Sequence, residues 1–285
     1  MEFIVQRCSE YLALWSGEPA VMKKVCHLLV MMSKSRMSAT TITMPVWHSL
    51  LQANANAGSF LTNSTGLSRL PSDLRGTLTQ AIVRTGMSAP TDEMRKAHFH
   101  EIVTPIANVL SSIVNVENFG SLPFVNNIEI IETIKLVLEL YSGIIAASEA
   151  NTFAMITTFI LPALPVFVKL LDVFHGHNQI VYLILKIFSS LVESQIAYLP
   201  PREALQIYTA CAELLRTYSK HNLGLKSRNA ASSEEESHMD VLQILDLLSF
   251  LIAKDCIDFS DDTASIAEVD GAEVGSTSDS CMEYF

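Results

Sequence analysis

The sequence is poor in turn-forming residues and in charge. Among its 285 residues, 11 are glycine, 10 are proline and 17% are charged, whereas soluble domains usually carry about 25% charged residues. An all-β fold needs frequent turns, so the scarcity of glycine and proline argues against one. The hydrophobic content of 49% argues against a chain that is disordered throughout.

Sequence signatures of catalysis and of phosphate binding are also missing. No GxSxG, GxxxxGK[ST] or GxGxxG occurs, so neither a nucleophile elbow nor a phosphate-binding loop is indicated. His100-Glu101 begins like a zinc-binding helix, but Thr104 stands where the second histidine would be required. His98 and His100 are two residues apart, which puts them on different sides of a helix.

One other histidine pair is a candidate metal site. His175 and His177 flank Gly176, with Asp172 nearby as a third ligand, but a fourth ligand or a spaced partner motif is missing. Histidines on the surface of a turn are the favoured interpretation. We therefore expect no enzyme activity, no cofactor and no metal.

Cysteine usage indicates a reducing compartment. No CxxC occurs, and the cysteines are scattered and odd in number, which favours buried free thiols over disulfides. They are Cys8, Cys26, Cys211, Cys256 and Cys281. The N-terminal stretch has an acid at position 2 and no long apolar run, so we expect no signal peptide.

Negative charge is concentrated at the end of the chain. Residues 255–285 contain no lysine or arginine, and their acids carry −9 of the net −11, which leaves −2 for residues 1–254. This distribution gives no basic patch for nucleic acid and is compatible with protein partners. The acids are Asp255, Asp258, Asp261, Asp262, Glu268, Asp270, Glu273, Asp279 and Glu283.

Apolar residues recur with a helical period nearly throughout. Spacings of three and four residues predict one buried stripe along residues 131–145 and another along residues 242–251. The first comprises Ile131, Ile134, Leu138, Tyr141 and Ile145, and the second Leu242, Leu245, Leu248 (with Leu247) and Leu251. A third stripe, on 200–218, comprises Ile207, Tyr208, Cys211, Leu214, Leu215 and Tyr218, which makes Cys211 a core residue.

Helix-breaking residues divide this pattern into segments that predict an all-α fold of stacked helical hairpins, an α-solenoid. The expected helices cover 2–15, 18–33, 44–53, 71–85, 92–115, 125–146, 150–172, 177–196, 200–218 and 236–254. From residue 71 they form pairs at steps of about 50 residues, close to known helical repeats. The expected organisation is N-terminal helices over 1–56, a loop over 57–70, the repeat array over 71–254 and an acidic, disordered tail over 255–285.

Two surfaces allow alternative interpretations. Glu129, Glu132 and Glu139 fall on one predicted helix, where a solvated face is favoured over an acidic strip for a basic partner. The methionines Met31, Met32, Met37 and Met44 favour ordinary core over an adaptable apolar surface. Arrays of repeats need caps, so we also expect exposed apolar helix faces towards both ends of the chain.

One apolar segment is a candidate membrane span. Thr157–Phe174 is strongly apolar, but it contains Pro162, Pro165, Lys169 and Asp172. A helix buried between neighbours is therefore favoured over a span, and a membrane protein built around 151–196 remains the alternative.

The run IYTACAELLRTYSKHNLG is followed by an acidic loop and LLSFLIAKDCIDFSD, and upstream stand LPSDLRGTLTQAIVRTG, NVENFGSL and QIAYL. In this order these helix sequences resemble the exportins, karyopherins of the importin-β superfamily. The resemblance is ordered over roughly residues 60–261, is weaker in the N-terminal part and ends after Asp261. Family members are several times longer, so it implies an internal segment without the N-terminal repeats that hold the main contacts with Ran.

The resemblance implies HEAT repeats stacked into a superhelix. It also implies transport between nucleus and cytoplasm, with protein cargo bound together with the GTP-bound form of the GTPase Ran. The hypusine-bearing translation factor 5A and Smad-type proteins are the implied cargo classes, and nuclear pore proteins are further implied partners.

The favoured function is a nuclear transport receptor segment that binds partners along one face of the array. The second helix of each pair is expected to line that face. Its candidate contact residues are Asp92, Glu93, Lys96, Lys169, Glu203, Glu213 and Arg216. A generic interaction scaffold without transport activity and an all-α enzyme with a pocket between helices are the alternatives.

Overall fold

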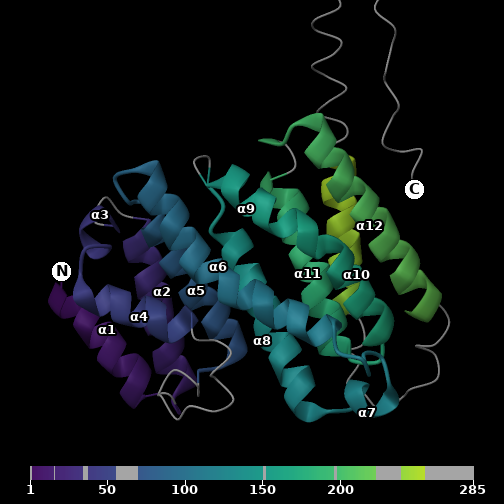
Figure 1. Cartoon of the computed structure of the whole chain (residues 1–285), viewed down its shortest axis with the longest axis horizontal. Helices are drawn as coiled ribbons and strands as arrows, with labels where there is room; N and C mark the ends of the chain where they lie inside the picture. The colour runs from purple at the N-terminus through teal and green to yellow at the C-terminus, as the bar shows by residue number, and fades with distance from the viewer. Residues whose placement is uncertain are drawn as a thin grey trace, which may run out of the picture. The chain divides into compact units, whose positions relative to one another are not determined.

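The computed structural model describes residues 2–15, 17–34, 38–55, 70–149, 152–195, 198–222 and 239–253. Within these ranges the regular elements are all helices (Figure 1), so the predicted all-α helical-repeat fold is confirmed. The chain divides into two compact units, Met1–Phe159 and Ile160–Phe285. The predicted tail over 255–285, and all of the predicted loop over 57–70 except Leu70, lie outside the described residues.

The helices follow one another closely along the chain. The first unit contains α1 (Glu2–Leu14), α2 (Pro19–Ser33), α3 (Ser38–Thr41), α4 (Pro45–Ala55), α5 (Ser72–Gly86), α6 (Asp92–Val114), α7 (Leu122–Val125) and α8 (Ile128–Ala146), and reaches its boundary in α9 (Phe153–Ile160). The second contains the 3-10 turn η3 (Leu161–Ala163), α10 (Leu164–Val173), α11 (Asn178–Gln195), α12 (Pro201–Asn222) and a helical segment over 239–253. Each predicted helix is present, with ends shifted by a few residues.

Local chemistry explains the differences from the predicted pattern. The helix predicted over 150–172 is interrupted at η3, where Pro162 lacks the N–H that an α-helical hydrogen bond requires. The short helices α3 and α7 were not predicted; α7 carries Pro123 in its first turn, where the missing N–H is tolerated. Asn127 accepts a hydrogen bond from the N–H of Glu129 at 2.9 Å, so α8 begins at Ile128 rather than at 125.

Within the first unit the helices pack as stacked hairpins. Helix α5 packs against α2 on one side and against α8 on the other, while α6 packs against α4, α5 and α8 (Figure 1). The stripe predicted on α8 is buried from Ile134 onward, with Ile134, Leu138, Tyr141 and Ile145 at most 1% exposed, whereas Ile131 is half-buried. Each hairpin therefore covers the apolar side of the next one, as repeat arrays do.

Two glycines allow α5 and α8 to approach closely. A Cβ placed on Gly76 would lie 2.5 Å from the carbonyl oxygen of Glu139, and one placed on Gly143 would collide with the carbonyl oxygen of Gly76. Both obstacles are backbone atoms, so no side-chain rotation could relieve them. The missing side chains at these positions therefore set the spacing of the two helices.

Charged side chains are buried near this crossing. Arg75 is 1% exposed, and burial lowers its pKa to about 9. Glu139 is also buried, because its position on α8 faces α5 at Gly76. The predicted solvated face holds for Glu132, which pairs with Lys135 at 2.6 Å, and is wrong for Glu139.

In the second unit α10 packs against both α11 and α12. The stripe predicted on α12 is buried except for the half-buried Leu215, and Cys211 lies buried at its centre. Cys8 and Cys26 are also buried free thiols, and burial raises the pKa of Cys26 to about 12. Among the described cysteines the predicted buried thiols are thus confirmed, whereas Cys256 and Cys281 lie outside the described residues.

The end of α12 is tied to the end of α10 by a polar cluster. Lys220 donates to Oδ1 of Asp172 at 3.0 Å and the Nε2–H of His221 donates to the same oxygen at 2.6 Å. The rings of His175 and His221 stack with centroids 4.0 Å apart. The hydrogen bonds from His221 and Lys220 lower the pKa of Asp172 below its usual range.

We expect Asp172→Asn to lower the free energy of unfolding of the second unit by less than about 1 kcal/mol at neutral pH, since the cluster is exposed to solvent. The folded pKa of Asp172 is depressed, so its contribution is present above the usual value of 3.8 and is lost as pH falls through the folded pKa. Thermal unfolding over a pH series should therefore show wild type and variant converging in acid. Asp246→Asn, at an exposed position on 239–253, is the control; a difference independent of pH would contradict the assignment.

The segment over 239–253 is attached to α12 by a buried hydrogen bond. The hydroxyl of Tyr218 donates to Oδ2 of Asp240 at 2.6 Å, and burial together with this carboxylate raises the pKa of Tyr218. Leu247 and Leu251 are buried, but Leu242 and Leu245 are 55% and 56% exposed. The stripe predicted over 242–251 is therefore wrong in its first half, because Asp240 and Leu247 set the buried side of the helix.

One helical run in the described part of the chain, Phe153–Val173, is long and apolar enough to cross a membrane by length and composition alone. Core helices of soluble proteins pass the same test. Ile156, Phe167 and Leu170 in this run are fully buried. In all, 44% of its most apolar window is buried, so the run packs against neighbours on part of its surface, and the absence of membrane insertion stays a prediction.

Candidate functional site

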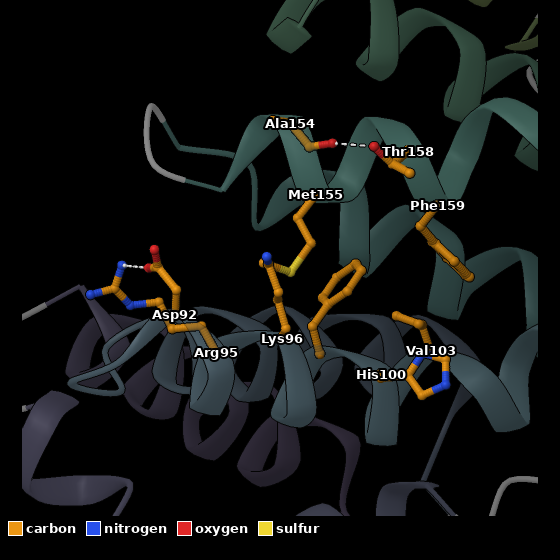
Figure 2. A pocket seen from close by; sticks show the side chains of 10 residues that line it. Asp92, Arg95, Lys96, His100, Val103, Ala154, Met155, Thr158 and Phe159 are labelled. Atoms are coloured by element: carbon orange, nitrogen blue, oxygen red, sulfur yellow. Dashed lines mark hydrogen bonds and ion pairs between the residues drawn. The ribbon is translucent and has the colours of Figure 1, made fainter.

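A pocket of 630 Å³ lies between α6 and α9 in the first unit (Figure 2). We call it the α6/α9 groove. In Figure 2 the side chains of Lys96 and Met155 extend toward each other from the two helices, with Asp92 and Arg95 towards one end and Val103 and His100 towards the other. Its lining consists of Asp92, Arg95, Lys96, Phe99, His100, Val103, Ala154, Met155, Thr158 and Phe159.

The sequence around Thr91 fixes where α6 begins and so which residues line the groove. The Thr91 side chain accepts a hydrogen bond from the N–H of Met94 at 3.3 Å, which caps the helix at Asp92. Positions 92, 96, 99 and 103 then follow at spacings of three or four residues and share one side of α6. The opposite wall comes from α9, whose sequence FAMITTFI contains no charged residue.

Aromatic contacts hold the apolar wall of the groove in place. The ring of Phe159 stacks on that of Tyr141, with centroids 5.1 Å apart, and meets Phe99 edge to face at 5.9 Å. Tyr141 is 1% exposed, and burial raises the pKa of its hydroxyl. Since Tyr141 belongs to α8, three helices fix the position of Phe159.

At the mouth of the groove, one basic side chain forms an ion pair within the described part of the chain and the other does not. Arg95 pairs with Asp92 at 2.9 Å and also donates from Nε to the carbonyl oxygen of Ala89 at 2.8 Å. Lys96, which is exposed, has no ion-pair partner among the described residues. The lining therefore carries one cation that is not neutralised by a neighbour.

The predicted contact residues fall into separate groups. Asp92, Glu93 and Lys96 lie together at the start of α6, and two of them line the groove. Lys169 is exposed on α10 in the second unit. On α12, Glu203 is half-buried near the beginning, while Glu213 and Arg216 are exposed further along.

The residues that sequence reasoning missed are the apolar ones. Phe99, Met155 and Phe159 were not singled out, because apolar side chains at helical spacing are typical of an ordinary buried helix face. The available signal was the lack of charge in α9 opposite a helix that begins with charged residues.

Other candidate chemistry finds little support in the described residues. No group of three or more histidine, cysteine, aspartate or glutamate side chains there could hold a metal ion. His98 is packed beside His48 with ring centroids 5.7 Å apart, and burial followed by the charge of His48 lowers its pKa. The buried thiols have raised pKa values, whereas a reactive cysteine needs a lowered one.

Exposed apolar side chains, which were expected towards both ends of the chain, form a second surface on α1. They share one face of that helix with Arg7, whose guanidinium lies 5.1 Å from the Phe3 ring centroid. The face comprises Phe3, Ile4, Tyr11 and Leu14, which are 43% to 76% exposed. Of the methionines for which ordinary core was favoured, Met44 is buried and Met31 is 52% exposed, while Met37 lies outside the described residues.

Comparisons with known proteins agree with the resemblance seen in the helix sequences. A family model described as Exportin-4 matches residues 1–269, so the match includes the N-terminal helices and continues past Asp261. Exportin-4 of Dictyostelium discoideum is 25% identical over 239 residues, which make up 80% of this chain and 20% of that relative. The chain thus spans about a fifth of the length of this curated relative.

Proposed function

Because the chain belongs to the exportin-4 family, we propose that it is part of a karyopherin-type nuclear transport receptor. In this proposal it binds protein cargo together with GTP-bound Ran and moves between nucleus and cytoplasm. Translation factor 5A and Smad-type proteins are the proposed cargo classes, and nuclear pore proteins are further proposed partners.

The observation that carries this proposal is the family match over nearly the whole chain. The fold supports it, since stacked helical hairpins offer long surfaces for protein partners. Within the first unit the α6/α9 groove is the proposed place for such a contact, because it combines apolar side chains with charge at its mouth. The receptor segment is therefore proposed to act by binding rather than by catalysis.

The test uses purified components. The immobilised chain is incubated with translation factor 5A alone, with Ran loaded with a non-hydrolysable GTP analogue, or with Ran loaded with GDP. We expect the GTP form to raise cargo retention by about tenfold, in the usual range for coupled binding sites. The control is a chain carrying Lys23→Glu, an exposed position on α2, which should behave like wild type.

Other outcomes separate the alternatives. Equal cargo retention with and without GTP-bound Ran would favour an interaction scaffold without transport activity. Retention of neither Ran nor cargo would overturn the proposed function.

A further inference from the structure

We propose that the α6/α9 groove receives an acidic, amphipathic segment of a partner protein. This inference rests on the proposed function only in assuming a protein partner. It adds what that partner presents to the chain: apolar side chains on one face, with carboxylates beside them.

The charges around the groove favour an acidic occupant. Lys96 lies in the lining and has no ion-pair partner among the described residues, whereas the carboxylate of Asp92 is already engaged by Arg95. Helix α9 contributes no charge of either sign to the opposite wall. A carboxylate near Lys96 would therefore gain an ion pair without displacing one, and an ammonium there would be repelled.

The lining of the groove favours an apolar anchor. Phe99 and Val103 are 5% and 4% exposed at its base, and the half-buried Met155 and Phe159 form the other wall. The volume of 630 Å³ is in the range of ligand-binding pockets, and the groove is open to solvent along one side. An amphipathic helix with apolar residues at i, i+3, i+4 and i+7 would place adjacent side chains in such a groove.

Contacts with neighbouring helices fix the ring of Phe159, so the apolar wall of the groove is already formed before a partner binds. Its ring is stacked on Tyr141 of α8 and meets Phe99 of α6 edge to face. The polar groups at the wall are also satisfied, since the Thr158 hydroxyl donates to the carbonyl oxygen of Ala154 at 2.8 Å. A preformed apolar surface reduces the ordering that association requires.

A nucleic-acid strand fits these observations less well. Strands bound through their phosphates need several cations along a groove, together with exposed stacking surfaces. Here one of the two cations in the lining is paired, and Phe99 is buried. Nucleic acid is therefore an outcome of the test rather than the proposal.

The experiment measures fluorescence anisotropy of labelled peptides with the purified whole chain, without Ran. The probe is a peptide of about 16 residues, or about four helical turns, with leucine and phenylalanine on one face and glutamate elsewhere. The comparison probes are the same peptide with glutamate replaced by lysine, a scrambled acidic peptide of equal composition, and a single-stranded RNA oligomer. The acidic amphipathic peptide should bind most tightly, and its affinity should fall as salt rises.

Variants test whether the peptides bind in the α6/α9 groove. Lys96→Glu should lower the affinity for the acidic peptide by about three- to tenfold and should raise the affinity for the lysine peptide. Thr158→Trp, at an exposed position on α9, should fill the groove and lower the affinity for every amphipathic peptide by at least about tenfold. Lys23→Glu on α2 is the matched charge reversal and should leave binding unchanged, and circular dichroism checks that each variant is folded.

Three results would overturn the inference. They are equal binding of the scrambled peptide, tighter binding of RNA, and an unchanged affinity in both groove variants. Because Ran and cargo are absent, these results leave the proposed function untouched. Conversely, loss of Ran-dependent retention with intact peptide binding would overturn the proposed function alone.

Discussion

Gly143→Ala is expected to lower the free energy of unfolding of the first unit by about 1–3 kcal/mol. Overpacking of a well-packed contact typically has this effect, and here the added methyl group meets the carbonyl oxygen of Gly76, which belongs to the backbone of α5. Alanine favours a helix over glycine by about 1 kcal/mol, which offsets part of the loss. We expect the collision to outweigh this gain, since relieving it requires α5 and α8 to move apart.

Hydrogen exchange of the α5 and α8 amides, together with thermal unfolding, measures this effect. Gly176→Ala is the matched control, because nothing lies within 4 Å of a Cβ at Gly176. It should be neutral or slightly stabilising. A Gly143→Ala protein as stable as wild type would show that the two helices are not held at the described spacing.

Tyr218→Phe is expected to cost about 1–3 kcal/mol in the second unit, because it leaves the buried carboxylate of Asp240 without the hydroxyl that donates to it. The loss should appear first in the helical segment over 239–253. Tyr218 has a raised pKa, so the contribution of its hydroxyl is present below its usual value of 10 and is lost as pH rises through the folded pKa.

Hydrogen exchange across 239–253 measures this prediction, and the variant should exchange faster there than wild type. The control is Tyr182→Phe on α11, a half-buried tyrosine whose hydroxyl has no hydrogen bond within the described part of the chain. If Tyr218→Phe changed neither local exchange nor stability, the contact between Tyr218 and Asp240 would not anchor this helix.

The sequence predicted where the long helices lie along the chain, but it did not predict how they contact one another. Apolar spacing and breakers located each long helix, because those signals act within a few residues of one another. The glycine crossing was not predicted, since Gly76 and Gly143 are far apart in the sequence and each alone is only a weak point in a helix. Glu139 was wrongly expected on a solvated face for the same reason, because its burial depends on the position of α5 and not on the sequence of α8.

The candidate site was predicted in part. Asp92 and Lys96 were selected as polar residues on the second helix of a hairpin, and both line the groove. The apolar wall was missed, because the periodicity of α9 is the same whether Met155 and Phe159 face a core or a groove. Which of these holds is decided by where α6 lies, and that depends on tertiary packing.

The central claim is that this chain acts by binding a protein in the α6/α9 groove. The most direct measurement repeats the retention assay with translation factor 5A and GTP-bound Ran, using the immobilised chain that carries Thr158→Trp. Loss of cargo retention by a folded variant, with Lys23→Glu unaffected, is the predicted result. Full retention by Thr158→Trp would contradict the account.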